Sequence, residues 1–170
     1  MVLARKSQVP LLDVGDAFPQ LELTLVSGRR FSLPTDLSKP FNVVLVNRGF
    51  WCPFCVGQLI AFQAGLPTLT EEGIGVVSIS ADSREKALEL VAEKKLAFPV
   101  GYGASVDGVA DTLGLYYDPA PTHMAPYLQS AGFLLGPNRQ VLSAVYSSGA
   151  IGRFVWQDVL GLVRYVKSLA

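Results

Sequence analysis

Cysteine, histidine and charged residues are all scarce in this sequence. Its 170 residues include two cysteines and one histidine, and only 16% of them are charged. Fourteen Lys and Arg balance fourteen Asp and Glu, so the formal net charge is zero. Because a nucleic-acid-binding protein needs a basic face, this balance argues against a nucleic-acid partner. Two cysteines are also too few for the disulfide framework of a small secreted protein.

Long apolar runs are lacking as well. None approaches the ~18 residues that a membrane-spanning helix requires, which argues against a membrane partner. The first residues lack the basic start and long apolar stretch of a signal peptide, so we expect a cytoplasmic protein. Apolar residues nevertheless make up 50% of the chain, enough for one full core, and we expect a single domain over residues 1–170. Zero net charge offers little repulsion between copies, which favours a homodimer.

Strand and helix patterns alternate along the chain. After an irregular lead-in over residues 1–20, alternating apolar residues predict a β-hairpin from strands 21–25 and 30–33. This order predicts an α/β fold in which helices flank a central mixed sheet, preceded by that N-terminal hairpin. Buried strands are predicted at 41–47 and 74–80, a short strand at 98–100, a second hairpin from 133–135 and 140–146, helices at 54–69, 83–95, 105–112 and 153–168, and an ordered loop at 116–126.

The two cysteines lie only three residues apart, in Cys52-Pro53-Phe54-Cys55, between a buried strand and a helix. A disulfide here would close a very short ring and stabilise the fold little, so chemistry explains the pair better than architecture. A thiol at a helix N-terminus faces unpaired N–H groups and the positive end of the helix dipole, which favour the thiolate. We expect Cys52 to attack and Cys55, one turn further on, to resolve.

Two other interpretations of the pair are weaker. Two buried cysteines could fall together by chance, but the coincidence of strand, Trp51, cysteine pair and helix argues against it. A structural zinc site needs four ligands, and the chain has no third cysteine and only His123, in a Pro-rich loop where we expect solvent exposure or hydrogen bonding. The sequence therefore predicts neither a metal nor a cofactor.

With these motifs, the chain resembles the thioredoxin superfamily and, more closely, the peroxiredoxin-like alkyl hydroperoxide reductase/thiol-specific antioxidant (AhpC/TSA) family. The resemblance covers roughly residues 12–168. It rests on the opening segment 14–19, the hairpin ending in 30–33, the Arg-Gly-Phe-Trp-Cys-Pro-Phe-Cys motif at 48–55, the segments 98–100 and 113–116, the final hairpin within 132–146, and Gly152-Arg153.

The resemblance implies a thioredoxin-like fold and roles for individual residues. Cys52 matches the peroxidatic cysteine, which becomes a sulfenic acid and then condenses with a resolving thiol. Arg153 matches the arginine that stabilises the thiolate and polarises the peroxide. Three positions depart from the family: Gly49 replaces a Thr or Ser whose hydroxyl orients the peroxide, Leu45 replaces a proline, and Gly132 stands where relatives carry Thr or a cis-proline. The residues expected to line the substrate site are Gly49, Phe50, Trp51, Pro53 and Gly132.

Three functions follow from this pattern. The first is a thiol-dependent peroxidase that reduces hydrogen peroxide or organic hydroperoxides through a Cys52 sulfenate and a Cys52–Cys55 disulfide, with a thioredoxin- or glutaredoxin-type reductant. The second is a thioredoxin-type thiol–disulfide oxidoreductase acting on a protein or small disulfide. The third is a redox sensor or interaction module. Exposed aromatic residues near the pair would suit an organic substrate or a dimer contact, for which Tyr116 and Tyr117 are the interface candidates.

Overall fold

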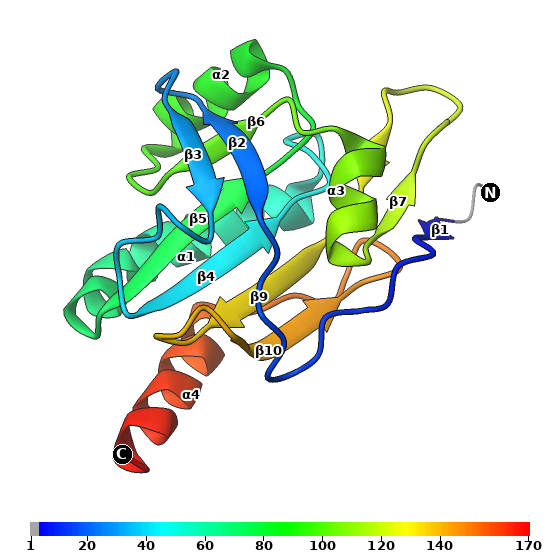
Figure 1. Cartoon of the computed structure of the whole chain (residues 1–170). Helices are drawn as coiled ribbons and strands as arrows, with labels where there is room; N and C mark the ends of the chain where they lie inside the picture. The colour runs from blue at the N-terminus through cyan, green and yellow to red at the C-terminus, as the bar shows by residue number, and fades with distance from the viewer. Residues whose placement is uncertain (1–3) are drawn as a thin grey trace.

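A computed structural model describes residues 4–170 as a mixed seven-stranded sheet between two layers of helices, with a smaller sheet at one edge (Figure 1). The strand order of the large sheet is β10-β9-β4-β5-β6-β2-β3, and its central strands β4, β5 and β6 run parallel. The strands are β1 (Arg5–Lys6), β2 (Leu21–Leu25), β3 (Arg30–Leu33), β4 (Phe41–Val46), β5 (Ile74–Ile79), β6 (Val100–Tyr102), β7 (Tyr116–Asp118), β8 (Tyr127–Leu128), β9 (Ala131–Leu135) and β10 (Val141–Tyr146), and the helices are α1 (Pro53–Glu71), α2 (Arg84–Lys94), α3 (Val106–Leu113) and α4 (Trp156–Ser168).

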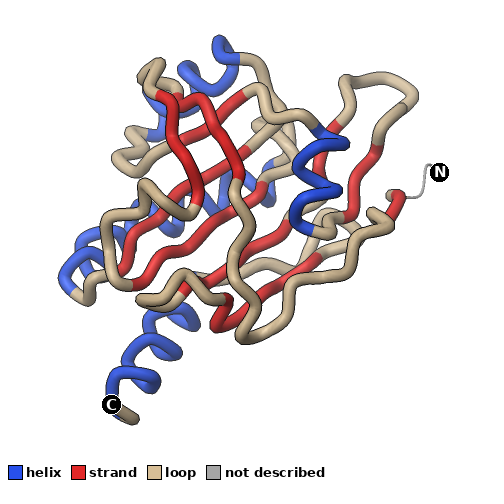
Figure 2. Tube along the Cα trace, in the orientation of Figure 1, coloured by secondary structure: helices blue, strands red, loops and turns tan. Residues whose placement is uncertain are grey.

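The central strand β4 is fully buried and separates two hydrophobic cores. Val44 and Val46 point into the core beneath α3, whereas Val43 and Leu45 point into the core beneath α1, α2 and α4. This alternation follows from the two-residue period of a strand. Figure 2 shows the strands between α3 on the near side and α1 on the far side. The predicted sheet, flanking helices and both hairpins are therefore confirmed.

Two segments predicted to be irregular contain short strands. β1 lies within residues 1–20, β7 lies within 116–126, and together with β8 they form the separate antiparallel sheet β1-β7-β8. Strands of two or three residues are too short to show a periodic pattern, and their pairing joins distant parts of the chain, such as Arg5 with Tyr117. The sequence therefore contains no local signal for this sheet.

Several element boundaries differ from prediction by one to three residues, and two of these differences have a clear cause. The strand predicted at 98–100 begins at Val100 and continues to Tyr102, because β2 pairs with its last two residues. The helix predicted at 153–168 begins only at Trp156, because Arg153 is directed at the cysteine pair instead of joining the helix. Within residues 4–170, no helix combines the length and the apolar character that crossing a membrane would require.

A close contact between α1 and α4 yields a stability prediction. Gly65 of α1 lies against Trp156, so an added Cβ would sit 2.4 Å from a carbon of the indole ring. We expect Gly65→Ala to destabilise the fold by about 1–3 kcal/mol through overpacking. Gly161→Ala is the matched control: this helical glycine has open space around it, and the substitution should stabilise by about 0.5–1 kcal/mol. Urea unfolding of both variants tests this, and equal stabilisation by both would contradict it.

Candidate active site

The two cysteines begin helix α1, directly after the loop that follows β4. Cys52 is the N-cap residue and Pro53 occupies the first helical turn, where its missing N–H leaves no hydrogen bond unmade. The Cys52 carbonyl accepts hydrogen bonds from the backbone N–H groups of Cys55 and Val56, each at 3.1 Å. Both cysteines are free thiols, and they are 1% and 0% exposed. The predicted strand–cysteine pair–helix arrangement is thus present.

Arg153 reaches the cysteine pair from the loop before α4. Its Nη2 lies 3.2 Å from Cys55 Sγ and 3.9 Å from Cys52 Sγ, so both sulfurs lie within 4 Å of one nitrogen. The guanidinium is held in place because it also donates to the Gln58 side chain at 3.3 Å and to the Ala150 carbonyl at 3.0 Å. This geometry joins the three residues that the sequence singled out for chemistry, with Arg153 closer to Cys55 than to Cys52.

A second arginine, Arg48, contacts the pair from the loop between β4 and α1. Its Nη1 lies 3.6 Å from Cys52 Sγ, and its backbone N–H donates to Cys55 Sγ at 3.3 Å. The guanidinium carbon lies 4.8 Å from the ring centre of Trp51 and 5.2 Å from that of Tyr127, within cation–π range of both. The two rings also touch edge to face at 5.0 Å. Arg48 is therefore held by two aromatic rings at Cys52.

Neither of these arginines has a carboxylate partner in the described part of the chain. The ion pairs among residues 4–170 lie elsewhere, joining Lys94 to Glu93 and Glu72 to both Arg164 and Lys167. Two half-buried guanidinium groups thus face two thiols without an acidic side chain to balance them. A thiolate at Cys52 would supply the missing negative charge.

The environments of the two thiols move their pKa values in opposite directions. Burial raises the pKa of Cys52, but hydrogen bonds from the backbone N–H and thiol of Cys55 and from Arg48 outweigh it, so the net pKa is lowered. Burial raises the pKa of Cys55; the positive charge of Arg153 offsets this in part, and the negative charge of a Cys52 thiolate adds to it. Cys52 is therefore the more acidic thiol of the pair, as expected for the attacking residue.

The loop over residues 47–51 is fixed from both sides. Asp82, which follows β5, accepts the Phe50 backbone N–H at 2.9 Å, and burial raises the pKa of this carboxyl group. The Gly49 carbonyl accepts the Cys52 N–H at 3.1 Å. Gly49 has φ +147°, and an added Cβ would lie 2.3 Å from the Trp51 indole nitrogen. Glycine is required at this position because the Trp51 ring occupies the space of a side chain.

The other predicted lining residues lie in different surroundings. Phe50 is half-buried and packs against the core on the side of α2, whereas Pro53 is exposed. Gly132 in β9 lies beneath Phe154, because a Cβ there would be 2.5 Å from the phenyl ring. None of these contacts involves a cysteine sulfur, so their part in binding a substrate stays a prediction.

The two interface candidates and the histidine also have defined places. Tyr116 and Tyr117 are half-buried in β7, where β1 pairs with them. β1 therefore covers part of the edge that these tyrosines would present to a second copy. His123 is exposed. Within residues 4–170, no group of three or more His, Cys, Asp or Glu side chains is arranged to hold a metal ion.

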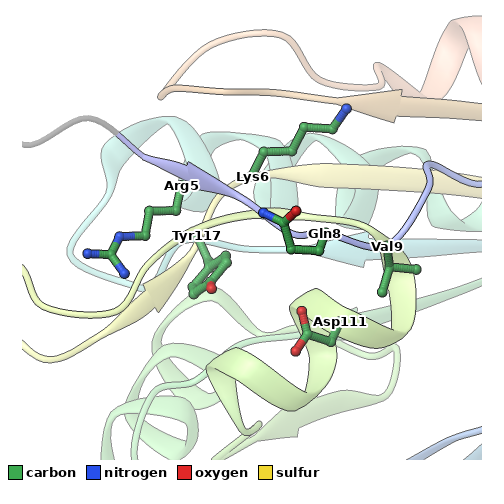
Figure 3. Close-up of a pocket in the computed structure, with 6 residues that line it drawn as sticks. All are labelled: Arg5, Lys6, Gln8, Val9, Asp111 and Tyr117. Atoms are coloured by element: carbon green, nitrogen blue, oxygen red, sulfur yellow. The ribbon is translucent and has the colours of Figure 1, made fainter.

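Two cavities differ in their relation to the cysteines. A mostly apolar cavity of about 310 Å³ lies between α1 and the loop before α4, and Arg153 and Gln58 form part of its wall together with Phe54, Phe62 and Phe154. A cavity of about 590 Å³ lies between β1, β7 and α3 and contains no residue of the site (Figure 3). The smaller cavity thus leads to the guanidinium that contacts both sulfurs.

Sequence reasoning missed four residues of this site: Arg48, Gln58, Asp82 and Tyr127. Arg48 had a local signal, because it lies only four positions before Cys52, in the short loop that leads to the start of α1. A basic residue there can reach the cysteine. Gln58 had a weaker one, because it follows Cys55 by three residues and so lies on the same face of α1. Tyr127 had none, since only the pairing of β7 with β8 brings it to the site.

Comparison with known proteins agrees with the family resemblance of the sequence. The model of the AhpC/TSA family matches residues 14–142. Among solved structures, the fold is similar to peroxidoxin BcpB from Mycobacterium tuberculosis, with a TM-score of 0.75 and 19% identity over 91% of this chain and 98% of that one. It is also similar to a mutant of peroxiredoxin 6 from Arenicola marina, with a TM-score of 0.78 and 17% identity over 92% of this chain and 74% of that one.

A third similar structure is AhpC from Mycobacterium tuberculosis, with a TM-score of 0.72 and 19% identity over 94% of this chain and 95% of that one. No curated protein sequence matches the chain. These structural similarities confirm the thioredoxin-like fold that the motif implied. Since the family match extends over more than half of the chain, the protein belongs to the AhpC/TSA family, and its class is that of the peroxiredoxin-type oxidoreductases.

Proposed function

We propose that the protein is a thiol-dependent peroxidase that reduces a hydroperoxide with Cys52 and stores the oxidation as a Cys52–Cys55 disulfide. The observation that carries this proposal is the pair of guanidinium groups at the two sulfurs, which have no carboxylate partner among residues 4–170. A fixed cation there favours the thiolate before the reaction and stabilises the oxygen anion that leaves during it. Family membership supports the same chemistry.

The first step oxidises the Cys52 sulfur by two electrons. The thiolate attacks one peroxide oxygen, an S–O bond forms as the O–O bond breaks, and the second oxygen leaves as an alkoxide or hydroxide that takes up a proton. Cys52 is left as a sulfenic acid, and the peroxide becomes an alcohol or water. Arg153, which reaches both sulfurs, lies within range of the oxygen that develops negative charge.

The second step joins the two sulfurs. The Cys55 thiolate attacks the Cys52 sulfenic acid, an S–S bond forms, and the hydroxyl group leaves as water after taking up a proton. The two residues are one helical turn apart, so the closure is local. A dithiol reductant of thioredoxin or glutaredoxin type then reduces the disulfide and itself becomes oxidised. We place this cycle in a reducing compartment such as the cytoplasm, with the homodimer as the proposed assembly.

The apolar cavity beside Arg153 supports an organic hydroperoxide as one substrate. Its wall includes Phe54, Phe62 and Phe154, which suit an alkyl or aryl group, and Arg153 lies at the same wall for the peroxide oxygens. Hydrogen peroxide would use Arg153 and the sulfurs alone. Comparison of the two peroxides therefore reports on the contribution of the cavity.

A thioredoxin-type disulfide oxidoreductase is the second candidate, because Cys52 caps α1 and Cys55 follows one turn later, as in a dithiol exchange pair. This function predicts reduction of insulin disulfides that survives Arg153→Ala. A redox sensor is the third candidate, and it predicts slow reaction with peroxide but a change in partner binding on oxidation.

The test is the rate at which the reduced protein reacts with hydrogen peroxide and with cumene hydroperoxide. We expect both reactions to exceed that of a free thiol by about a hundredfold or more, the scale of charge stabilisation in a preorganised site. The Cys52→Ser variant should not react, and mass spectrometry of the oxidised wild type should find a Cys52–Cys55 disulfide. A rate no faster than that of a free thiol would exclude the peroxidase function.

A further inference from the structure

The guanidinium groups of Arg48 and Arg153 contact the two sulfurs differently. The guanidinium of Arg48 lies 3.6 Å from Cys52 Sγ, whereas Arg48 contacts Cys55 through its backbone N–H. Arg153 is closer to Cys55, at 3.2 Å, than to Cys52, at 3.9 Å. The family resemblance assigns the cation at the attacking sulfur to Arg153, yet Arg48 is the nearer guanidinium. The two arginines are therefore not equivalent.

The position of Arg48 is fixed by aromatic rings instead of by an acidic partner. Trp51 and Tyr127 both lie within cation–π range of the guanidinium, and the Tyr127 hydroxyl accepts only a long hydrogen bond from it, at 3.5 Å. A carboxylate in their place would neutralise the arginine and weaken its effect on the sulfur. Aromatic faces hold the guanidinium while leaving its full charge available to Cys52.

We propose that Arg48 is the catalytic residue that keeps Cys52 in its thiolate form, and that Trp51 and Tyr127 are positioning residues that hold Arg48 at the sulfur. The proposal rests on the proposed function only in taking Cys52 as the attacking thiol. Arg48 would also compensate for Gly49, because its Nη1 places beside Cys52 a donor that could orient the peroxide, as a hydroxyl at that position would. Arg153 would then act mainly on Cys55.

The proposal is tested by the ionisation of Cys52 itself, which requires no peroxide. The Cys55→Ser background leaves one thiol to titrate and keeps a hydrogen-bond donor at residue 55. Thiolate absorbance at 240 nm and the rate of iodoacetamide alkylation are measured against pH. The charged or titratable groups that face Cys52 and its loop are then Arg48, Arg153, Tyr127 and Asp82, and only the first two approach the sulfur.

We expect Arg48→Met to raise the pKa of Cys52 and to lower its alkylation rate at pH values below that pKa, where a rise of one unit reduces the thiolate fraction about tenfold. Arg153→Met should have a smaller effect. Arg29→Met is the matched control, because Arg29 also lies over an aromatic ring, at 5.1 Å from the ring centre of Phe31, but contacts neither sulfur. It changes the net charge equally and should leave the titration unchanged.

The positioning residues give a second, independent measurement. Tyr127→Phe keeps the ring and should preserve the titration, whereas Tyr127→Leu should raise the pKa of Cys52 in the same direction as Arg48→Met. In the Arg48→Met background, Tyr127→Leu should have no further effect, because the ring then has no cation to hold. A purely structural role for Tyr127 would lower the unfolding midpoint without moving the titration.

Two results would overturn the proposal: an unchanged Cys52 titration in both Arg48→Met and Arg48→Gln, or a larger shift in Arg153→Met than in Arg48→Met. If the Arg48 variants fail to fold, Tyr127→Leu decides through the same titration. The outcome is separate from the peroxidase test. Slow peroxide reduction by a wild type whose Cys52 pKa depends on Arg48 would reject the proposed function and leave this inference standing.

Discussion

In the Cys55→Ser variant, peroxide is expected to convert Cys52 to a sulfenic acid and the reaction to stop there. One equivalent of peroxide should be consumed per chain, after which turnover with a dithiol reductant should be lost. The reason is that Cys55, which lies beside Cys52 at Arg153, is the resolving thiol, and the sequence contains no third cysteine to replace it. Mass spectrometry measures the trapped intermediate, as one added oxygen atom at Cys52 in the unlabelled protein or as the adduct that dimedone forms with the sulfenic acid.

The site also explains why the two thiols would react in order. While Cys52 is a thiolate, its negative charge raises the pKa of Cys55 and keeps the second thiol protonated. Once Cys52 becomes a sulfenic acid, this repulsion is gone, whereas the positive charge of Arg153 remains 3.2 Å from Cys55 Sγ. Oxidation of the first sulfur therefore favours ionisation of the second.

The wild type, in which Cys52 reacts before Cys55, is the control for the Cys55→Ser experiment. In the wild type, burial raises the pKa of Cys55, so the disulfide-forming step should accelerate as the pH rises toward that pKa, because the reactive thiolate becomes more abundant. The lowered pKa of Cys52 should make the first step less dependent on pH over the same range. Wild-type turnover that persists in Cys55→Ser would show that an external thiol resolves Cys52, and would contradict the proposed internal disulfide.

Much of this fold could be predicted because its strands and helices carry long patterns. The run 41–46 is apolar except for Asn42, as expected for a strand buried on both faces, and the Cys-Pro sequence marks the first turn of α1. The short strands β1, β7 and β8 could not, because two or three residues show no period, and β1 pairs with a segment more than 100 residues away. The start of α4 differs from the prediction for a related reason: the helical pattern does not reveal that Arg153 is directed at the cysteines.

The candidate site was predictable where a residue's role depends on its local position. Cys52 and Cys55 follow from the helix start, and Arg153 followed from a family motif. Arg48 belongs to the same motif, but its position at Cys52 depends on Tyr127, which is 79 positions away in the sequence. Interactions that join distant segments, such as this one, had to come from the structure.

Replacing Gly49 by Thr, which restores the residue type of the family, is expected to damage the protein. The φ of +147° disfavours any side chain, and the new Cβ would lie 2.3 Å from the Trp51 indole nitrogen and 3.2 Å from an Asp82 carboxylate oxygen. Backbone strain of about 1–3 kcal/mol and overpacking of similar size both oppose the substitution. We expect the free energy of unfolding to fall by roughly 2–6 kcal/mol.

The same substitution should also slow the chemistry. Trp51 must move to make room, and Trp51 is one of the two rings that hold Arg48 at Cys52. We therefore expect slower alkylation of Cys52 and slower peroxide reduction in Gly49→Thr, measured beside urea unfolding. Gly149→Thr is the matched control: this loop glycine has no atom within 4 Å of an added Cβ and no positive φ, so both readouts should stay near wild type.

A double variant separates the two sources of damage. Gly49→Thr combined with Trp51→Ala removes the clash but keeps the backbone strain, so part of the stability should return while Cys52 alkylation stays slow, because Arg48 has lost one of its rings. If Gly49→Thr instead keeps wild-type stability and reduces peroxide faster, a hydroxyl at this position can act on the substrate without disturbing Arg48. In that case Gly49 would merely lack the hydroxyl of the family. Lost stability and slow alkylation would instead show that Gly49 makes room for Trp51, which holds Arg48 at Cys52.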